Sequence, residues 1–190
     1  MTPDPENGRR DTEMDAATEE LKSLLDREKI RECIALLARG EDRRDADLIR
    51  AGFWPDSTVD FGMFQGDFGA YLDWVVPGSP AVVVTQHFLG QSVIRLQDAG
   101  ALVETLVNSY HRIDMGGPQE RDIVLGGRYL DRLDKRGDDW RIAQRTMLYD
   151  WCQDFGVSAD WSNGVMGAPF SAEHFSGRAV GDFSTIFFGK

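Results

Sequence analysis

The chain has 190 residues, 42% of them hydrophobic, and a formal net charge of −11. This length is enough for one well-buried domain, and the composition is that of an ordinary soluble globular protein. An acidic surface repels phosphate backbones, so the charge argues against nucleic acid as a partner, and the lack of a basic run argues against an anionic membrane surface.

The two cysteines, Cys33 and Cys152, form no CxxC pair and lie near no clustered histidine. The sequence therefore predicts neither a disulfide framework nor a metal site. The N-terminus lacks the apolar segment of a signal peptide, and no apolar stretch approaches the roughly 20 residues that span a bilayer. We therefore expect a cytoplasmic protein.

The first part of the chain predicts a disordered tail followed by helices. Residues 1–15 are rich in Pro, Asp, Glu and Gly, as disordered tails are. A helix is predicted over 24–39, where Asp26 is the expected N-cap and Gly40 is expected to end or bend the helix. Its apolar face follows helical spacing through Ile30, Cys33, Ile34 and Leu37.

The remainder of the domain predicts two more helices and a sheet. A turn and short helix are expected within 40–56, a short strand at 57–64 and a third helix at 67–76. Four strand-like runs bounded by turn residues follow, at 81–96, 101–114, 122–136 and 139–151. Helices early and an antiparallel meander late indicate an α+β fold, with a curved sheet wrapped around the helices and enclosing one pocket.

These boundaries divide the chain into three parts. The disordered tail is 1–15, the catalytic domain is 16–152, and an aromatic-rich C-terminal extension is 153–190. The extension is too aromatic for a plain disordered tail. We expect it to pack on the domain, on a neighbouring subunit or over the pocket mouth.

His87 is the first candidate catalytic residue, because it lies inside the apolar run VVVTQHFLG, residues 82–90. A buried imidazole needs a hydrogen-bond partner. An Asp partner raises the pKa of a histidine and burial lowers it, and the balance can leave a base near the working pH. A lone histidine in such a strand is more often a satisfied core group, so both interpretations stand at this point.

The carboxylate partner has to come from the acidic turn after the first helix. Extending the apolar helix face by one turn gives Glu41, and Asp42 turns inward only if Gly40 breaks the helical phase. Glu41 and Asp45 are therefore the fallback candidates. The competing interpretation is a solvated, charged turn.

Two further charged or titratable residues are candidates on the strands. His111 faces inward if the odd positions of its strand do, and otherwise lies at the rim. Arg145 either binds a phenolate, a carboxylate or an oxyanion in the pocket, or forms a surface salt bridge. Asp131 and Asp134 are expected on the surface, and His174 is expected to have no chemical role.

Aromatic side chains supply the candidate substrate contacts. An aromatic, mostly apolar cavity with few polar groups is typical of a small-molecule site and suits a flat aromatic or polycyclic ligand. The predicted substrate-binding residues are Trp54, Phe61, Phe88, His111, Tyr129 and Tyr149.

Five segments in this order resemble the SnoaL-like branch of the nuclear-transport-factor-2-like superfamily. They are LLDREKIRECIALLARGEDRRD, FWPDSTVDFG, TQHFLGQSVI, GGRYLDRLDKRGDDWRIAQR and YDW, and they cover roughly residues 24 to 151. The groups that look nearest are scytalone dehydratase, hexachlorocyclohexane dehydrochlorinase and bile-acid dehydratase. The resemblance implies a cone-shaped α+β barrel with an internal pocket, in a homo-oligomer, with a trimer favoured and a dimer as the alternative.

The resemblance also implies a chemistry. Those groups are cofactor-free lyases that pair an Asp at the end of the first helix with a strand His, and these positions match Asp42 and His87. Arg145 matches an Arg of the bile-acid enzyme. A Tyr that some members place five residues before the Asp is Leu37 here, which puts simple dehydration in doubt.

The predicted function is thus a cofactor-independent lyase acting on a small aromatic or polycyclic substrate. Water, halide or a carbon fragment such as formaldehyde would leave after proton abstraction. An isomerase or cyclase using the same base is the first alternative, and a non-catalytic ligand-binding protein is the second.

Overall fold

The computed structural model describes residues 5–117 and 119–189. The helices are α1 (Pro5–Arg43), α2 (Ala46–Gly52), α3 (Phe68–Val75) and, in the C-terminal extension, a 3-10 turn (Ala172–His174) and α4 (Phe183–Phe187). The strands are β1 (Phe53–Asp60), β2 (Gln65–Asp67), β3 (Val82–Gln97), β4 (Gly100–Asp114), β5 (Glu120–Arg136) and β6 (Asp139–Val157).

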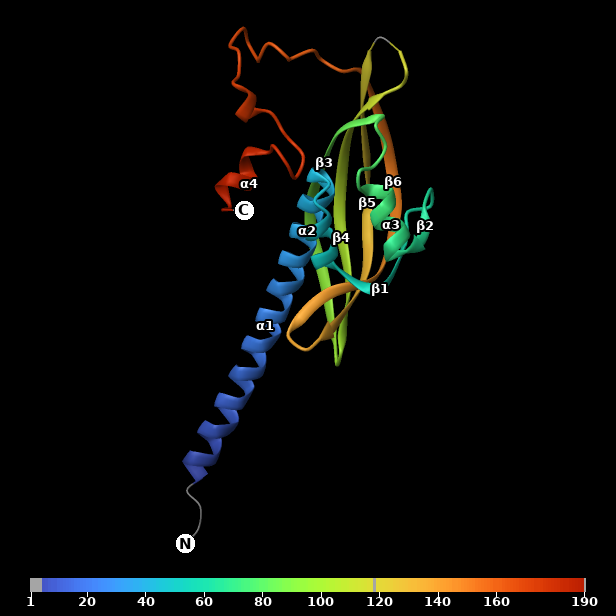
Figure 1. Cartoon of the computed structure of the whole chain (residues 1–190). Coiled ribbons are helices and arrows are strands. Elements are labelled where there is room, and N and C mark those ends of the chain that lie inside the picture. Colours follow the sequence, from blue (N-terminus) through green and yellow to red (C-terminus); the bar gives the residue numbers. More distant parts are fainter. Residues whose placement is uncertain (1–4, 118, 190) are drawn as a thin grey trace.

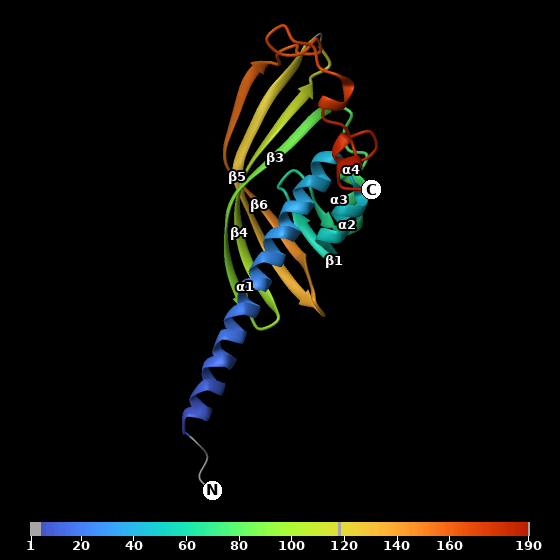
Figure 2. The same ribbon diagram turned by 90° about the vertical axis from the view of Figure 1, so that its left-hand side faces the viewer.

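The strands form one curved sheet in the order β2-β1-β6-β5-β4-β3. Helix α1 crosses the concave side of this sheet, and α2 and α3 lie beside it (Figure 2). The predicted α+β fold with a sheet wrapped around N-terminal helices is confirmed. The sheet is mixed rather than wholly antiparallel, because β1 pairs in parallel with β6, and it does not close into a barrel.

The C-terminal half of α1 supplies the core face predicted from its spacing. Ile30, Ile34 and Leu37 are almost completely buried. Gly40 does not end the helix. A Cβ atom there would lie 2.9 Å from Leu48 Cβ, so the missing side chain lets α2 fold back closely on α1. The helix continues to Arg43.

The N-terminal half of α1 differs from the prediction. The expected disordered tail is helical from Pro5 onward, and residues 1–4 lie outside the described residues. Asp26 is not an N-cap. It lies inside the helix and accepts hydrogen bonds from Lys135 Nζ and Trp140 Nε1, each at 2.8 Å, which ties α1 to the β5–β6 hairpin. The first turns of α1 project beyond the sheet (Figure 1).

The C-terminal extension folds back over the end of α1 (Figure 1). Ala179 N donates to Arg43 O at 2.7 Å, and Arg43 forms an ion pair with Asp182 at 3.0 Å. Arg178 donates to the carbonyl oxygens of Asp42 and Val83. The extension therefore lies on the domain next to the acidic turn. Within the described part of the chain, none of the helices has the length and apolarity needed to cross a membrane.

Candidate active site

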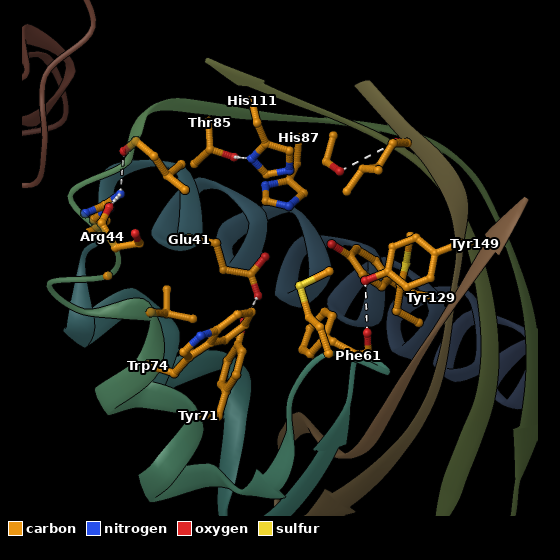
Figure 3. Close-up of a pocket in the computed structure, with 18 residues that line it drawn as sticks. Glu41, Arg44, Phe61, Tyr71, Trp74, Thr85, His87, His111, Tyr129 and Tyr149 are labelled. Atoms are coloured by element: carbon orange, nitrogen blue, oxygen red, sulfur yellow. Dashed lines mark hydrogen bonds between the residues drawn. The ribbon is translucent and has the colours of Figure 1, made fainter. Parts of the chain in front are cut away.

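A cavity of about 210 Å³ lies between the concave side of the sheet, the end of α1 and helix α3 (Figure 3). The exposed surface of its wall is mostly apolar, and polar side chains from several elements are interspersed among the aromatic and aliphatic ones. The lining residues with polar or titratable side chains include Glu41, Tyr71, His87, His111, Tyr129 and Tyr149. Such a partly open, mostly apolar cavity with a limited set of polar groups is typical of a small-molecule site.

Asp42 and His87 meet at the edge of this cavity. His87 Nδ1 lies 2.7 Å from Asp42 Oδ1, and the backbone N–H of His87 donates to both carboxylate oxygens at 3.0 and 3.1 Å. Both side chains are close to nine-tenths buried, and His87 lines the cavity. The contact that the resemblance implied is therefore present in the structure.

Helical geometry explains why Asp42 points inward. Ala38, one turn earlier, is buried beside Leu37, so the apolar face of α1 is wide enough to place both Glu41 and Asp42 toward the sheet. No break at Gly40 is needed. Asp45, the other fallback, instead caps α2, where its carboxylate accepts from two backbone N–H groups.

The Asp42 contact fixes which nitrogen of His87 is available. Since a carboxylate only accepts hydrogen bonds, the proton lies on Nδ1 and the lone pair is on Nε2. Burial lowers the pKa of His87, but the Asp42 hydrogen bond and the charges of Glu41 and Asp42 outweigh it, so the net pKa is raised. The arrangement is suited to a general base.

His111 lies on the neighbouring strand and lines the same cavity. Its ring centroid is 6.4 Å from that of His87, and its Nδ1 shares a hydrogen bond with Thr85 Oγ1 at 3.1 Å. Burial and the charge of His87 lower its pKa to about 4. His111 is therefore neutral near pH 7, and it belongs to the inward-facing set of β4 with Val103 and Val107.

Arg145 does not line the cavity. Its side chain is 1% exposed and donates two hydrogen bonds of 2.8 Å to Asp131, its cross-strand partner on β5. Its guanidinium lies over the far side of the Tyr129 ring, 4.0 Å from the centroid. This placement corrects the expectation that Arg145 contacts substrate, and it corrects the surface placement of Asp131. Burial lowers the pKa of Arg145, but Asp131 outweighs burial and raises it.

Two of the predicted substrate-binding residues lie elsewhere. Phe88 is 71% exposed on the convex side of the sheet, because it directly follows the inward-facing His87 on β3. Trp54, at the start of β1, donates to Asp134 O and packs under the guanidinium groups of Arg136 and Arg141. Phe61, His111, Tyr129 and Tyr149 line the cavity.

Helix α3 and the loop after it contribute residues that were not predicted. Tyr71 and Trp74 form an aromatic wall with Phe61, whose ring stacks on Tyr71 at 5.5 Å between centroids (Figure 3). Arg44 lies at the mouth and donates to carbonyl oxygens of the loop, Ser79 at 3.1 Å and Val82 at 2.7 Å. The helical spacing of α3 showed that it has an apolar face but not what that face would meet.

Among residues 5–117 and 119–189, no three His, Cys, Asp or Glu side chains are grouped so that they could hold a metal ion. Cys33, the more buried thiol, lies on α1, and burial raises its pKa to about 12. The polar chemistry of the cavity thus lies in Asp42, His87, His111, Glu41 and the tyrosines.

Comparison with known families finds a match over most of the domain. The profile of the SnoaL-like domain matches residues 22–146. A search of the curated proteins finds no match.

Solved structures support the same fold. A hexachlorocyclohexane dehydrochlorinase of type 2 superposes with a TM-score of 0.66 at 14% identity, covering 82% of this chain and 99% of that one. A candidate scytalone dehydratase from Novosphingobium aromaticivorans gives 0.60 at 20% identity, covering 76% and 95%. A nuclear-transport-factor-2-like protein from Salmonella enterica gives 0.56 at 15% identity, covering 64% and 89%.

Proposed function

The chain belongs to the SnoaL-like domain family, and on that premise we propose that it is a cofactor-independent lyase with His87 as its general base. The observation that carries the proposal is the 2.7 Å contact between His87 Nδ1 and Asp42 Oδ1 at the wall of a partly open, mostly apolar cavity. A non-catalytic ligand site has no need of a buried carboxylate that orients an imidazole.

In the proposed reaction, Nε2 of His87 takes a proton from a carbon or hydroxyl group of the substrate. When water or halide leaves, the electron pair of the broken C–H bond forms a new double bond and the leaving group departs with its own bonding pair. When formaldehyde leaves, the electron pair of the broken O–H bond forms the carbonyl of formaldehyde, and the pair of the broken C–C bond stays on the ring carbon, which takes up a proton from solvent. Asp42 holds the imidazole in one tautomer and stabilises the imidazolium that forms. The proton then passes from His87 to the leaving group or to solvent, which regenerates the base.

The proposed substrate is a small molecule with an aromatic ring. Phe61, Tyr71 and Trp74 present ring faces and edges to the cavity, and aromatic pairs of this kind hold flat ligands by stacking and edge contacts. The volume of about 210 Å³ suits a compact ligand rather than a polymer.

The proposal also names the residue that assists the departure of the leaving group. Leu37, at the position of the family tyrosine, is completely buried in the core and supplies no proton donor. Tyr129 lines the cavity, and burial together with the charge of Glu41 raises its pKa well above the usual value, so it stays a neutral phenol. Tyr129 is the proposed hydrogen-bond donor to departing water, halide or a carbonyl fragment such as formaldehyde.

The experiment is a product screen by liquid chromatography and mass spectrometry. Phenolic, steroidal and halogenated compounds are incubated with the wild-type protein and with His87→Ala. A lyase gives products lighter by water, a hydrogen halide or formaldehyde, and we expect His87→Ala to lose activity by roughly 10²–10⁴-fold. Products of unchanged mass would indicate the isomerase or cyclase alternative.

The matched control is His174→Ala. His174 is an exposed residue of the extension, and its Nδ1 shares a hydrogen bond with the Ser171 hydroxyl. It is not among the residues that line the cavity. Its replacement is expected to leave turnover unchanged. Full activity in His87→Ala would contradict a base mechanism of either kind.

A further inference from the structure

Glu41 presents an unpartnered carboxylate oxygen in the cavity. It precedes Asp42 in the last turn of α1 and is only 6% exposed, yet it lines the pocket. Oε1 accepts a hydrogen bond of 2.5 Å from Tyr71, and Arg145 Nη1 lies 3.6 Å from the same oxygen. Oε2 is buried and has no hydrogen-bond partner among the described residues. Figure 3 shows the side chain pointing into the middle of the cavity.

The nearby charges leave this carboxylate only partly compensated. Arg145 directs Nε and Nη2 to Asp131, so a single nitrogen remains for Glu41. Asp42 is occupied by His87. On this side of the cavity Glu41 therefore has only the third nitrogen of Arg145 near it, since the Arg145–Asp131 pair is behind the wall. Such a wall repels an anionic group and favours a neutral hydrogen-bond donor.

Among the described residues, Arg44 is the only arginine that lines the cavity, and its guanidinium is occupied by backbone carbonyl groups rather than available to a ligand. Arg44 donates to the loop carbonyls of Pro77, Ser79 and Val82 at the mouth. Arg145 lies behind the Tyr129 ring. Neither guanidinium is placed to bind an anion beside Glu41 Oε2.

We propose that Glu41 determines substrate specificity, with Oε2 accepting a hydrogen bond from a hydroxyl group of a neutral aromatic ligand. The Tyr71 hydroxyl holds the other oxygen and so fixes the direction of Oε2, and the rings of Phe61 and Trp74 lie beside the ligand position. This rests on the proposed function for the site but concerns binding rather than proton abstraction. It narrows the substrate class to phenols and hydroxylated aromatic compounds.

A site with a buried polar group rejects analogues that leave this group unpaired. The test is a ¹⁹F NMR titration with 4-fluorophenol, 4-fluoroanisole and 4-fluorobenzoate. The three probes share a ring and differ in carrying a hydroxyl donor, no donor, or a negative charge. We expect the wild-type protein to bind 4-fluorophenol at least about tenfold more tightly than either of the others. Equal binding of the phenol and the anisole, or preferred binding of the benzoate, would overturn the proposal without any variant.

Glu41→Gln tests the residue itself. Because Tyr71 donates to the amide oxygen, the amide N–H₂ group takes the place of Oε2 and donates to the oxygen of either probe. The preference for phenol over anisole should therefore fall to within about threefold. The matched control is Glu28→Gln on the exposed side of α1, where the side chain is 74% exposed and the preference should be unchanged.

His87→Ala separates this inference from the proposed function. We expect the variant to keep the phenol preference, since the preference belongs to Glu41. If His87→Ala loses the preference and Glu41→Gln keeps it, the hydroxyl group is bound by His87 and the inference about Glu41 is wrong, while the base mechanism stands. If Glu41→Gln loses the preference and His87→Ala keeps full turnover, the inference stands and the proposed function fails.

Discussion

His87 and His111 face one cavity but have opposite shifts in pKa. Both are buried, and burial lowers the pKa of each. Only His87 has a carboxylate on Nδ1, and this contact reverses the effect of burial. His111 has the Thr85 hydroxyl in that position, which adds no charge. When the surroundings shift the pKa values of two titratable groups in opposite directions, one group commonly acts as the base and the other as a neutral hydrogen-bonding group.

The first prediction concerns the pH dependence of kcat/KM. His87 acts as a base only when neutral, so kcat/KM rises with pH until the raised pKa of His87 is passed and is level above it. Asp42→Asn removes the negative charge that strengthens this hydrogen bond and raises the pKa, while burial still lowers the pKa and only Glu41 remains to raise it by its charge. The midpoint of the profile therefore moves to lower pH, and the plateau falls by roughly 10²-fold or more.

The profile is measured from pH 5 to 9 alongside Asp47→Asn. The Asp47 side chain is 90% exposed in an ion pair with Arg50, so this control removes a charge from the same turn without touching His87. A midpoint that stays in place in Asp42→Asn, or moves upward, would show that Asp42 does not set the protonation of the base.

The second prediction concerns Arg145 and protein stability. Arg145→Met leaves the completely buried Asp131 carboxylate without its two hydrogen bonds. Removing one partner of a buried pair costs about 3–5 kcal/mol, so we expect a loss of this size in the free energy of unfolding by urea. Arg145→Met with Asp131→Met should recover part of that loss, because the unpaired Asp131 charge is removed, whereas Glu41 still lacks the Arg145 guanidinium that lies 3.6 Å from its Oε1.

Arg136→Met is the comparison for Arg145. Arg136 pairs with Asp56 at 2.8 Å and with Asp134 at 3.2 Å on the surface, where solvent screens the charges, so its loss should destabilise the protein much less than the loss of Arg145. Near-normal stability of Arg145→Met with loss of activity alone would instead place Arg145 on the substrate.

Single residues were predictable where spacing along one element fixes their direction. The alternation of β4 offered an inward position for His111 beside a position at the rim, and the structure has it inward; helical spacing placed Glu41 inward. Asp131 lies in the inward-facing set of β5 with Tyr129 and Leu133, but a carboxylate is expected there only once Arg145 is known to lie directly across on β6. The exposure of Phe88 follows from period-two alternation once His87 faces inward, so this error was avoidable.

At the scale of elements, the C-terminal extension holds the two segments that carry the dyad. Arg178 donates to the carbonyl oxygens of Asp42 at 3.3 Å, Val82 at 3.2 Å and Val83 at 2.8 Å. It therefore links the end of α1 to the start of β3, five residues before His87. The extension acts as a brace between these two elements.

The third prediction tests this brace. Arg178→Gln removes hydrogen bonds to both elements, so the Asp42–His87 geometry loosens and kcat/KM falls by roughly tenfold, since small misplacements of catalytic groups are costly. Because the loosened Asp42 hydrogen bond raises the pKa of His87 less, the pH midpoint moves in the same direction as in Asp42→Asn, by a smaller amount. Arg31→Gln, on the exposed side of α1, is the control. Unchanged kinetics in Arg178→Gln would restrict the extension to a covering role.

Element order was predictable from the sequence, and element pairing was not. Helical and alternating periods located α3 and the strands β3, β4 and β5 to within two residues, whereas β6 continues to Val157, six residues beyond its predicted end and into the predicted extension. The parallel pairing of β1 with β6 depends on where the chain returns after α2, which no local pattern contains. The bounds of α1 were missed at both ends, because Asp26 and Gly40 have local signatures of helix ends but are held within the helix by tertiary contacts.

At the scale of the whole molecule, the convex side of the sheet carries an apolar surface. The side chains of Phe88, Val93 and Leu106 are 71%, 70% and 50% exposed on this side. Leu102, Leu130 and Leu148 add further exposed apolar area. The ion pair between Arg128 and Glu104 lies on the same side. In addition, the long strand β3 is the outermost strand of the sheet. Long edge strands and apolar patches of this kind are normally covered.

The fourth prediction is that copies of this chain cover that surface in a homotrimer. Light scattering after size exclusion should give three times the chain mass of 21.3 kDa. Phe88→Glu places a charge in the centre of the apolar surface and should yield monomers, since burying an unpaired charge is costly. Val180→Glu, at a 93% exposed position of the extension, should remain trimeric. Because Phe88 adjoins His87 on the edge strand, the monomeric variant should also lose activity. A wild-type protein that is a monomer with full turnover would instead show that this surface has another role.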